Sequence, residues 1–154
     1  MNLQALRTSP LATVLLLIMA VAACSPLASP FSEQAYRNAT AMKARSLSLV
    51  ARSGEPFVQH GDDVQALLTD IDAAYEYAKG LPRNEVVTEQ WRLIRDPDAG
   101  LVGSFASEWA RKGAFGATFR QDYAEEIAFA FDTVICVEIT KKSAADCNNK
   151  AEGQ

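Results

Sequence analysis

The stretch that decides the fold is PFVQHGDDVQALLTDIDAAYEYAK, Pro56–Lys79. Its apolar residues and one histidine recur at steps of three and four, which places them on one stripe of an α-helix. They are Phe57, His60, Val64, Leu67, Leu68, Ile71, Ala74, Tyr75 and Ala78. Gly54 and Pro56 punctuate the start of this run, and Gly80 and Pro82 its end. The spacing predicts an amphipathic helix over the whole stretch.

An alternative start for this helix stays open. Gly61 lies inside the run, and a glycine in a helix interior costs about 1 kcal/mol relative to alanine. The helix could therefore begin near Asp62, with Phe57–His60 as a loop.

The segments on either side also favour helix. Ser32–Arg52 carries an apolar stripe behind Ser32, which is a favourable N-cap residue. Near the other end of the chain, Thr118 could cap a run that stops at Lys141 and Lys142, whose charges suit a helix C-terminus. Part of that run, IAFAFDTVICVEI (127–139), has enough β-branched residues and period-2 content to keep a strand as its alternative.

The remaining segment, Asn84–Lys112, is interrupted by DPDAG at Asp96–Gly100, where the proline disfavours a continuous helix. The apolar stripe keeps its phase across the interruption, through Val87, Trp91, Ile94, Leu101, Phe105 and Trp109. Asn84 is the expected cap. The segment therefore predicts two short helices stacked as one rod. With short connections between four rods, the expected fold is an all-α, up-down-up-down four-helix bundle.

The N-terminus resembles an export signal. Arg7 precedes an apolar core at Leu11–Ala23, which as a helix reaches about 20 Å and falls short of a hydrocarbon core of about 30 Å. A short transmembrane anchor is the alternative. The core begins before the run LLLIMAVAACSPLASP (15–30) and continues through the first nine residues of that run. It ends directly before a single cysteine, Cys24.

Val21, Ala22, Ala23 and Cys24 resemble the lipobox of bacterial lipoproteins, an aliphatic residue and two small residues before cysteine. The resemblance implies that the thiol of Cys24 receives a diacylglyceryl group, that the leader is cut before it, and that the new amino terminus is acylated. Several acyl chains hold a protein on a membrane almost permanently. The alternative is a soluble exported protein in which Cys24 is incidental.

The same resemblance sets the expected domains and location. They are a signal peptide (1–23), the lipidated cysteine with its tether (24–31), the bundle (32–142) and a C-terminal tail (143–154). Ser25 stands where aspartate commonly retains Gram-negative lipoproteins in the inner membrane, so the outer membrane, facing the periplasm, is favoured. The runs AAYEYAKG (73–80) and NEVVTEQW (84–91) are also similar to small bacterial lipoproteins without assigned activity.

Charge and cysteine content narrow the partners. The formal net charge is −4, and loss of Arg7 with the leader makes the rest of the chain more acidic. This charge argues against nucleic acid as a partner and against a basic lipid-binding patch.

Lipidation of Cys24 would leave Cys136 and Cys147 in an oxidising compartment, where we expect a disulfide. Two independent cysteines are the alternative. The expected partners are the bilayer, through Cys24, and an unidentified envelope protein.

No motif predicts catalysis or a cofactor. His60 is the only histidine, no Glu-x-x-His, CxxCH or phosphate-binding glycine motif occurs, and Asp62 and Asp63 are more simply explained as charges at a helix N-terminus. Trp91 and Trp109 are predicted to lie in the core, and the alternative is that they bind a partner. A possible interaction surface comprises Trp91, Trp109, Phe115 and Phe119.

These observations favour a non-enzymatic, membrane-anchored envelope lipoprotein that serves as a protein-interaction or accessory subunit. The alternative function is a bundle that binds a small molecule or metal in an interhelical pocket near His60.

Overall fold

The described part of the chain is built entirely of helices. The computed structural model describes residues 29–151; the predicted signal peptide (1–23), Cys24 and residues 25–28 of the predicted tether lie outside the described residues. The helices are α2 (Glu33–Arg52), the 3-10 turn η1 (Phe57–Gln59), α3 (Gly61–Gly80), α4 (Glu85–Arg95), α5 (Val102–Lys112), α6 (Ala117–Thr140) and α7 (Ala144–Ala151). The all-α prediction is confirmed, and residues 127–139 are helical throughout.

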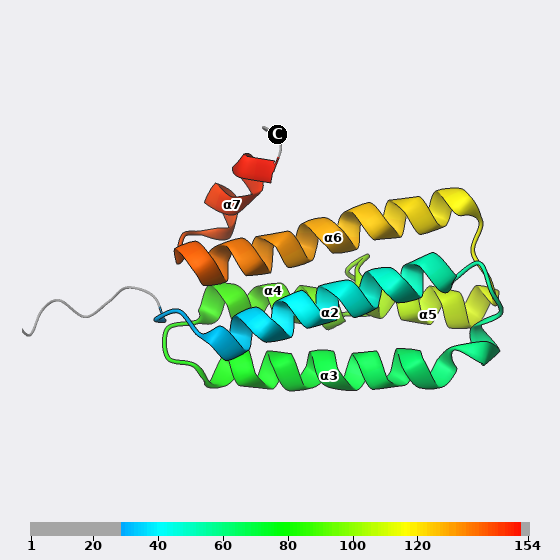
Figure 1. Ribbon diagram of the computed structural model, residues 1–154, viewed down its shortest axis with the longest axis horizontal. Helices are drawn as coiled ribbons and strands as arrows, with labels where there is room; N and C mark the ends of the chain where they lie inside the picture. Colours follow the sequence, from blue (N-terminus) through cyan, green and yellow to red (C-terminus); the bar gives the residue numbers. More distant parts are fainter. Residues whose placement is uncertain (1–28, 152–154) are drawn as a thin grey trace, which may run out of the picture.

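The long helices lie side by side (Figure 1). α3 runs back along α2, α4 and α5 follow each other in the direction of α2, and α6 returns. α2 and α4 each pack on both α3 and α6, so the four contacts close a ring around one core. The largest fully buried side chains fill this core: Leu67, Ile71, Trp91, Ile94, Phe105, Trp109, Ile127 and Phe131. α7 packs on α6 outside the ring.

Two helix ends follow the sequence closely. Ser32 caps α2, because its Oγ accepts the Ala35 N–H at 3.2 Å. α6 ends at Thr140, and Lys141 closes it in the left-handed conformation, with its N–H donated to the Val137 carbonyl at 2.8 Å. The expected stop near the Lys141 and Lys142 pair is thus confirmed.

Two predicted helix starts need correction. α3 begins at Gly61, and Phe57–Gln59 forms a separate 3-10 turn, so the later start considered for this helix is the better one. Phe57 leaves the helix because its N–H binds the Gly113 carbonyl at 2.7 Å, in a different connection. Thr118 is no cap: Gly116 holds the N-cap position, since the Phe115 N–H is fixed to the Ser53 carbonyl and the chain turns into α6 directly afterwards.

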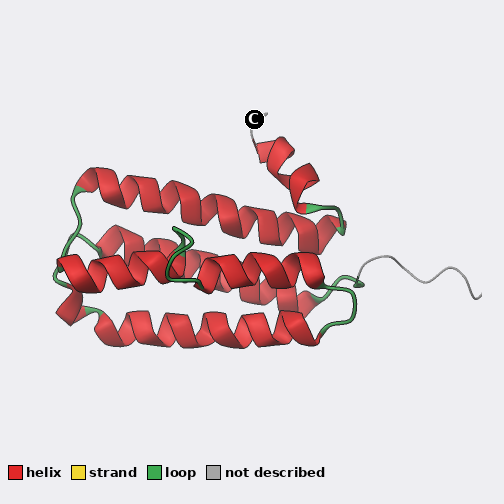
Figure 2. Ribbon diagram, turned by 180° about the vertical axis from the view of Figure 1, so that it is seen from behind, coloured by secondary structure: helices red, strands yellow, loops and turns green. Residues whose placement is uncertain are grey.

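The break between α4 and α5 lies where DPDAG predicts it, and the loop projects from between the two helices (Figure 2). Ser104 closes the loop: its Oγ donates to the Pro97 carbonyl at 2.6 Å and accepts the Gly100 N–H at 2.8 Å. Gly103 lies directly against the Arg95 carbonyl, where a side chain would collide with backbone. The two helices can therefore follow each other only with glycine at this contact.

The bundle has two ends, which we name the proximal and the distal end. The proximal end comprises residues 29–32, the C-terminal turns of α3 and α6, the connection 81–84 and the first turn of α4. The distal end comprises η1, the last turn of α5, the connection 113–116 and the first turn of α6. Among residues 29–151, no helix combines the length and apolarity needed to cross a bilayer.

Candidate functional site

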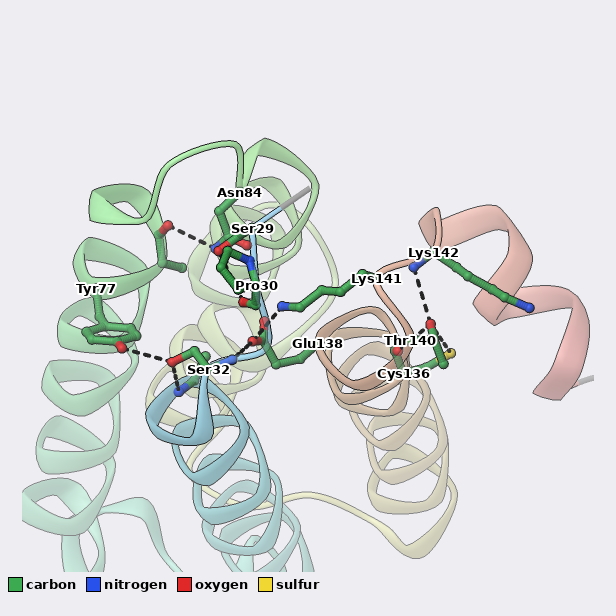
Figure 3. A network of polar contacts seen from close by, with 12 residues as sticks. Ser29, Pro30, Ser32, Tyr77, Asn84, Cys136, Glu138, Thr140, Lys141 and Lys142 are labelled. Carbon is green, nitrogen blue, oxygen red and sulfur yellow. Dashed lines mark hydrogen bonds and ion pairs between the residues drawn. The ribbon is translucent and has the colours of Figure 1, made fainter. Parts of the chain in front are cut away.

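The polar network at the proximal end is the candidate site, because it fixes the segment before α2 to three other segments of the bundle (Figure 3). Ser29 is buried, and its N–H donates to the Arg83 carbonyl at 3.1 Å. The Ser32 N–H donates to Glu138 Oε1 on α6 at 2.9 Å, and the Ser32 Oγ forms a hydrogen bond with the Tyr77 hydroxyl on α3 at 2.9 Å. The start of α2 is thereby held in one position against the bundle.

Glu138 is the centre of this network. Its side chain is 0% exposed, and the same Oε1 that accepts the Ser32 N–H also accepts Lys141 Nζ at 2.7 Å. Its second oxygen, Oε2, is buried without a hydrogen-bond partner. A buried carboxylate needs a counter-charge, and Lys141 supplies it from the turn that ends α6. Glu138 therefore joins the start of α2 to the end of α6.

Sequence reasoning missed Glu138, although a signal was present. Glu138 continues the three- and four-residue spacing of Ile127, Phe131 and Val134 along the buried stripe of α6. A charged residue on such a stripe indicates a buried polar contact.

Asn84 is the expected cap of α4, but its side chain makes a different contact. It precedes α4, but its side chain forms no cap hydrogen bond with that helix. Its Nδ2 instead donates to the Ala78 carbonyl near the end of α3 at 3.0 Å. The buried Asn84 side chain thus braces the α3–α4 connection, in which Arg83 adopts a positive φ of 56°.

The disulfide is present between Cys136 on α6 and Cys147 on α7, with the two Cα atoms 5.8 Å apart. Ser143 and Asp146 form a capping pair at the start of α7: the Ser143 hydroxyl donates to Asp146 Oδ2 at 2.6 Å, and the Asp146 N–H donates to Ser143 Oγ at 3.2 Å. The bond from the Ser143 hydroxyl, followed by one from the Ser143 backbone, lowers the pKa of the Asp146 carboxyl because both favour its ionised form. Residues 144–151, within the predicted tail, are accordingly helical and attached to α6.

The predicted interaction surface is corrected for three of its four residues. Trp91, Trp109 and Phe115 are buried, and only Phe119 lies at the surface. Trp91 meets Phe131 of α6 in an edge-to-face contact at 5.8 Å. Trp109 Nε1 donates to a backbone carbonyl near η1, and Phe115 stacks on Tyr123 at 5.6 Å, so these rings serve the core.

His60 is engaged within the fold. The ring is buried, lies 5.4 Å from Trp109 and is 2.7 Å from Glu55 Oε2 through Nε2. Asp63, an exposed residue of the first turn of α3, pairs with Arg52 at 3.3 Å. Within residues 29–151, no three His, Cys, Asp or Glu side chains are grouped to hold a metal ion.

Comparisons with known proteins found no match to this chain. No protein-family model matches the chain, and no curated protein and no solved structure matches it significantly.

Proposed function

We propose that this chain is a bacterial envelope lipoprotein, anchored through acylated Cys24, whose helical domain acts as a non-enzymatic interaction or accessory subunit. In this proposal α2, α3, the α4–α5 pair and α6 are the four rods of an up-down-up-down bundle. The outer membrane, facing the periplasm, is the favoured location, on the basis of Ser25.

The observation that carries the proposal is the lipobox Val21–Cys24 together with the short distance to the bundle. Only four residues separate Cys24 from Ser29, whose backbone binds the α3–α4 connection. The five steps from the Cα atom of Cys24 to that of Ser29 span at most about 18 Å. A lipid on Cys24 would therefore hold the domain directly at the membrane surface.

Mass spectrometry of the chain produced in a Gram-negative host tests the anchor. We expect a mature protein that begins at Cys24 and carries acyl groups, recovered with the membranes. Cys24→Ser is the control, and it should leave the leader uncut. A mature chain that begins at any other residue would contradict the proposal.

The distal end is the surface that we propose for a protein partner. Val58 is 86% exposed and Phe119 is 50% exposed at this end, which is the end remote from the predicted anchor. Lys112 Nζ lies 4.3 Å from the centre of the Phe119 ring, so a positive charge accompanies this exposed ring. Among these groups, the exposed phenylalanine ring is the kind of side chain that is enriched at protein interfaces.

Photo-crosslinking in cells tests this surface. A photoreactive phenylalanine analogue at Phe119 should give one discrete adduct with an envelope protein, and Val58→Glu should weaken that adduct. The same analogue at Thr69, an exposed residue in the middle of α3, is the control and should give none. Equal labelling at both positions would argue against a partner at the distal end.

A further inference from the structure

Exposed apolar side chains gather at the proximal end of the bundle. Among the described residues, seven large apolar side chains are exposed, and four of them belong to this end. Phe31 (55% exposed) precedes α2, Tyr77 (37%) lies near the end of α3, Val86 (45%) lies in the first turn of α4, and Ile139 (55%) lies in the last turn of α6. They come from four separate segments that meet only in the folded chain.

Polar contacts fix the backbone from which these side chains project. Ser32, next to Phe31, is bound to both Glu138 and Tyr77 (Figure 3). Ile139 follows Glu138 directly, and Val86 follows the braced connection at Asn84. The apolar groups therefore project from segments that hydrogen bonds join to one another.

The length of chain between this end and Cys24 identifies what covers it. Ser29 is bound at the proximal end, and the five steps along the chain from Cys24 to Ser29 span at most about 18 Å. The 24 residues of α6 extend about 36 Å along the bundle, so the distal end lies much farther from any lipid on Cys24. A bilayer that holds the acyl chains must pass close to the proximal end.

We propose that the proximal end rests on the bilayer, with Phe31, Val86 and Ile139 inserted into the interfacial layer and Tyr77 at its edge. This inference rests on the proposed acylation of Cys24. Apolar and aromatic side chains favour that layer, and each one inserted removes apolar surface from water. The bundle would then stand on the membrane and present its distal end to the periplasm.

The charges at this end are mixed. The basic residues Lys79, Arg83, Lys141 and Lys142 are accompanied by Glu76, which pairs with Lys79, by Glu85, and by Glu138, which pairs with Lys141. Attraction to anionic lipid is therefore not required, and contact through apolar groups should form on neutral lipid and persist at high salt.

Fluorescence quenching by brominated lipid tests the inference on the full, acylated protein. Val86→Trp places a reporter at the proximal end, and Val58→Trp places a matched reporter at the distal end, where the parent residue is also an exposed valine. The parent protein, with its buried Trp91 and Trp109, supplies the background. In brominated phosphatidylcholine vesicles we expect the emission added at residue 86 to be largely lost and the emission added at residue 58 to be retained.

Ile139→Trp gives a second proximal reporter in case Val86→Trp fails to fold, as judged by circular dichroism. Equal quenching at both ends would overturn the inference, because the bundle would then lie on its side. Protection of residue 86 from brominated lipid, together with emission that depends on protein density, would also overturn it and would indicate a second copy or another protein on this end. Mass spectrometry of the same sample separates the two proposals: acylated Cys24 with unquenched Val86→Trp refutes only the orientation, whereas unmodified Cys24 refutes both.

Discussion

At the scale of single residues, Glu138 joins the start of α2 to the end of α6. Its one bonded oxygen serves both the backbone N–H of Ser32 and the ammonium group of Lys141, and the side chain is fully buried. Removal of one partner from a buried, charged hydrogen bond leaves the others unsatisfied. The contribution of Glu138 to stability should therefore exceed that of the exposed ion pairs on the bundle surface.

Glu138→Ala should lower the free energy of unfolding by about 2 kcal/mol, because the Ser32 N–H and Lys141 both lose their acceptor. Glu138→Gln, which keeps an acceptor of similar shape and loses only the charge, should cost less. Urea denaturation of both variants measures the difference. An alanine variant as stable as the parent would show that the network contributes nothing.

Asp146 gives a pH dependence with a definite sign. Its pKa is lowered in the folded chain, first by the hydrogen bond from the Ser143 hydroxyl and then by the Ser143 backbone interaction. A lowered folded pKa contributes stability above the unfolded pKa, and that stability is lost as the pH falls through the folded pKa. Ser143→Ala should raise the pKa of Asp146 toward its ordinary value, and Ser143→Thr should not. Carboxyl NMR titration measures both, and an unchanged pKa in the alanine variant would contradict this account.

At the scale of elements, the junction between α4 and α5 depends on close backbone contact. A Cβ atom at Gly103 would collide with the Arg95 carbonyl oxygen and would lie 2.7 Å from the carbonyl carbon of Asp96. Neither atom belongs to a side chain that could rotate away. The turn that lets the two short helices continue one rod therefore admits only glycine at this position.

Gly103→Ala should destabilise the fold by about 2 kcal/mol or more, since the junction must shift to admit the methyl group. Gly80→Ala is the matched control: a Cβ atom there meets nothing within 4 Å, so that variant should be neutral or stabilised by about 0.5 kcal/mol. Thermal and urea unfolding compare the two. Similar losses in both variants would mean that the junction is not the cause.

At the scale of the whole molecule, the ring of α2, α3, α4 and α6 is distinct from α7, which packs on α6 beside it. The disulfide between Cys136 and Cys147 makes the covalent part of that attachment, and Thr133 adds a hydrogen bond to Asn148 at 2.7 Å. The core of the bundle is buried by the four-membered ring. Loss of the bond should therefore release α7 while the bundle remains folded.

Replacement of both Cys136 and Cys147 by serine should remove amide protection from α7 and leave that of the core helices largely intact. In the loop-entropy model, a disulfide that closes a segment of this size contributes roughly 3 kcal/mol of stability. This value sets the expected scale of the stability that α7 loses. Hydrogen exchange measures protection helix by helix. Collapse of protection in α2 and α3 as well would show that the disulfide supports the whole bundle.

Local patterns were enough to predict much of this fold. Helical periodicity predicts the all-α class. Ser32 predicts the cap of α2, and the DPDAG sequence predicts the break before α5. These features depend on groups a few residues apart, whose geometry the chain itself imposes. The pairing of Cys136 with Cys147 is also a local feature, because Cys136 lies near the end of α6 and Cys147 lies in the segment that follows.

The sequence alone thus predicted most of the helices, and the resemblance of Val21–Cys24 to a lipobox remains the basis of the functional proposal. Only the tertiary structure decided which aromatic rings are covered, since burial of Trp109 or Phe115 depends on the segment that lies across it. It also decided the partner of Glu138, which lies 106 positions from Ser32 in the sequence. Contacts over such separations arise from packing of whole helices, and no short-range pattern encodes them.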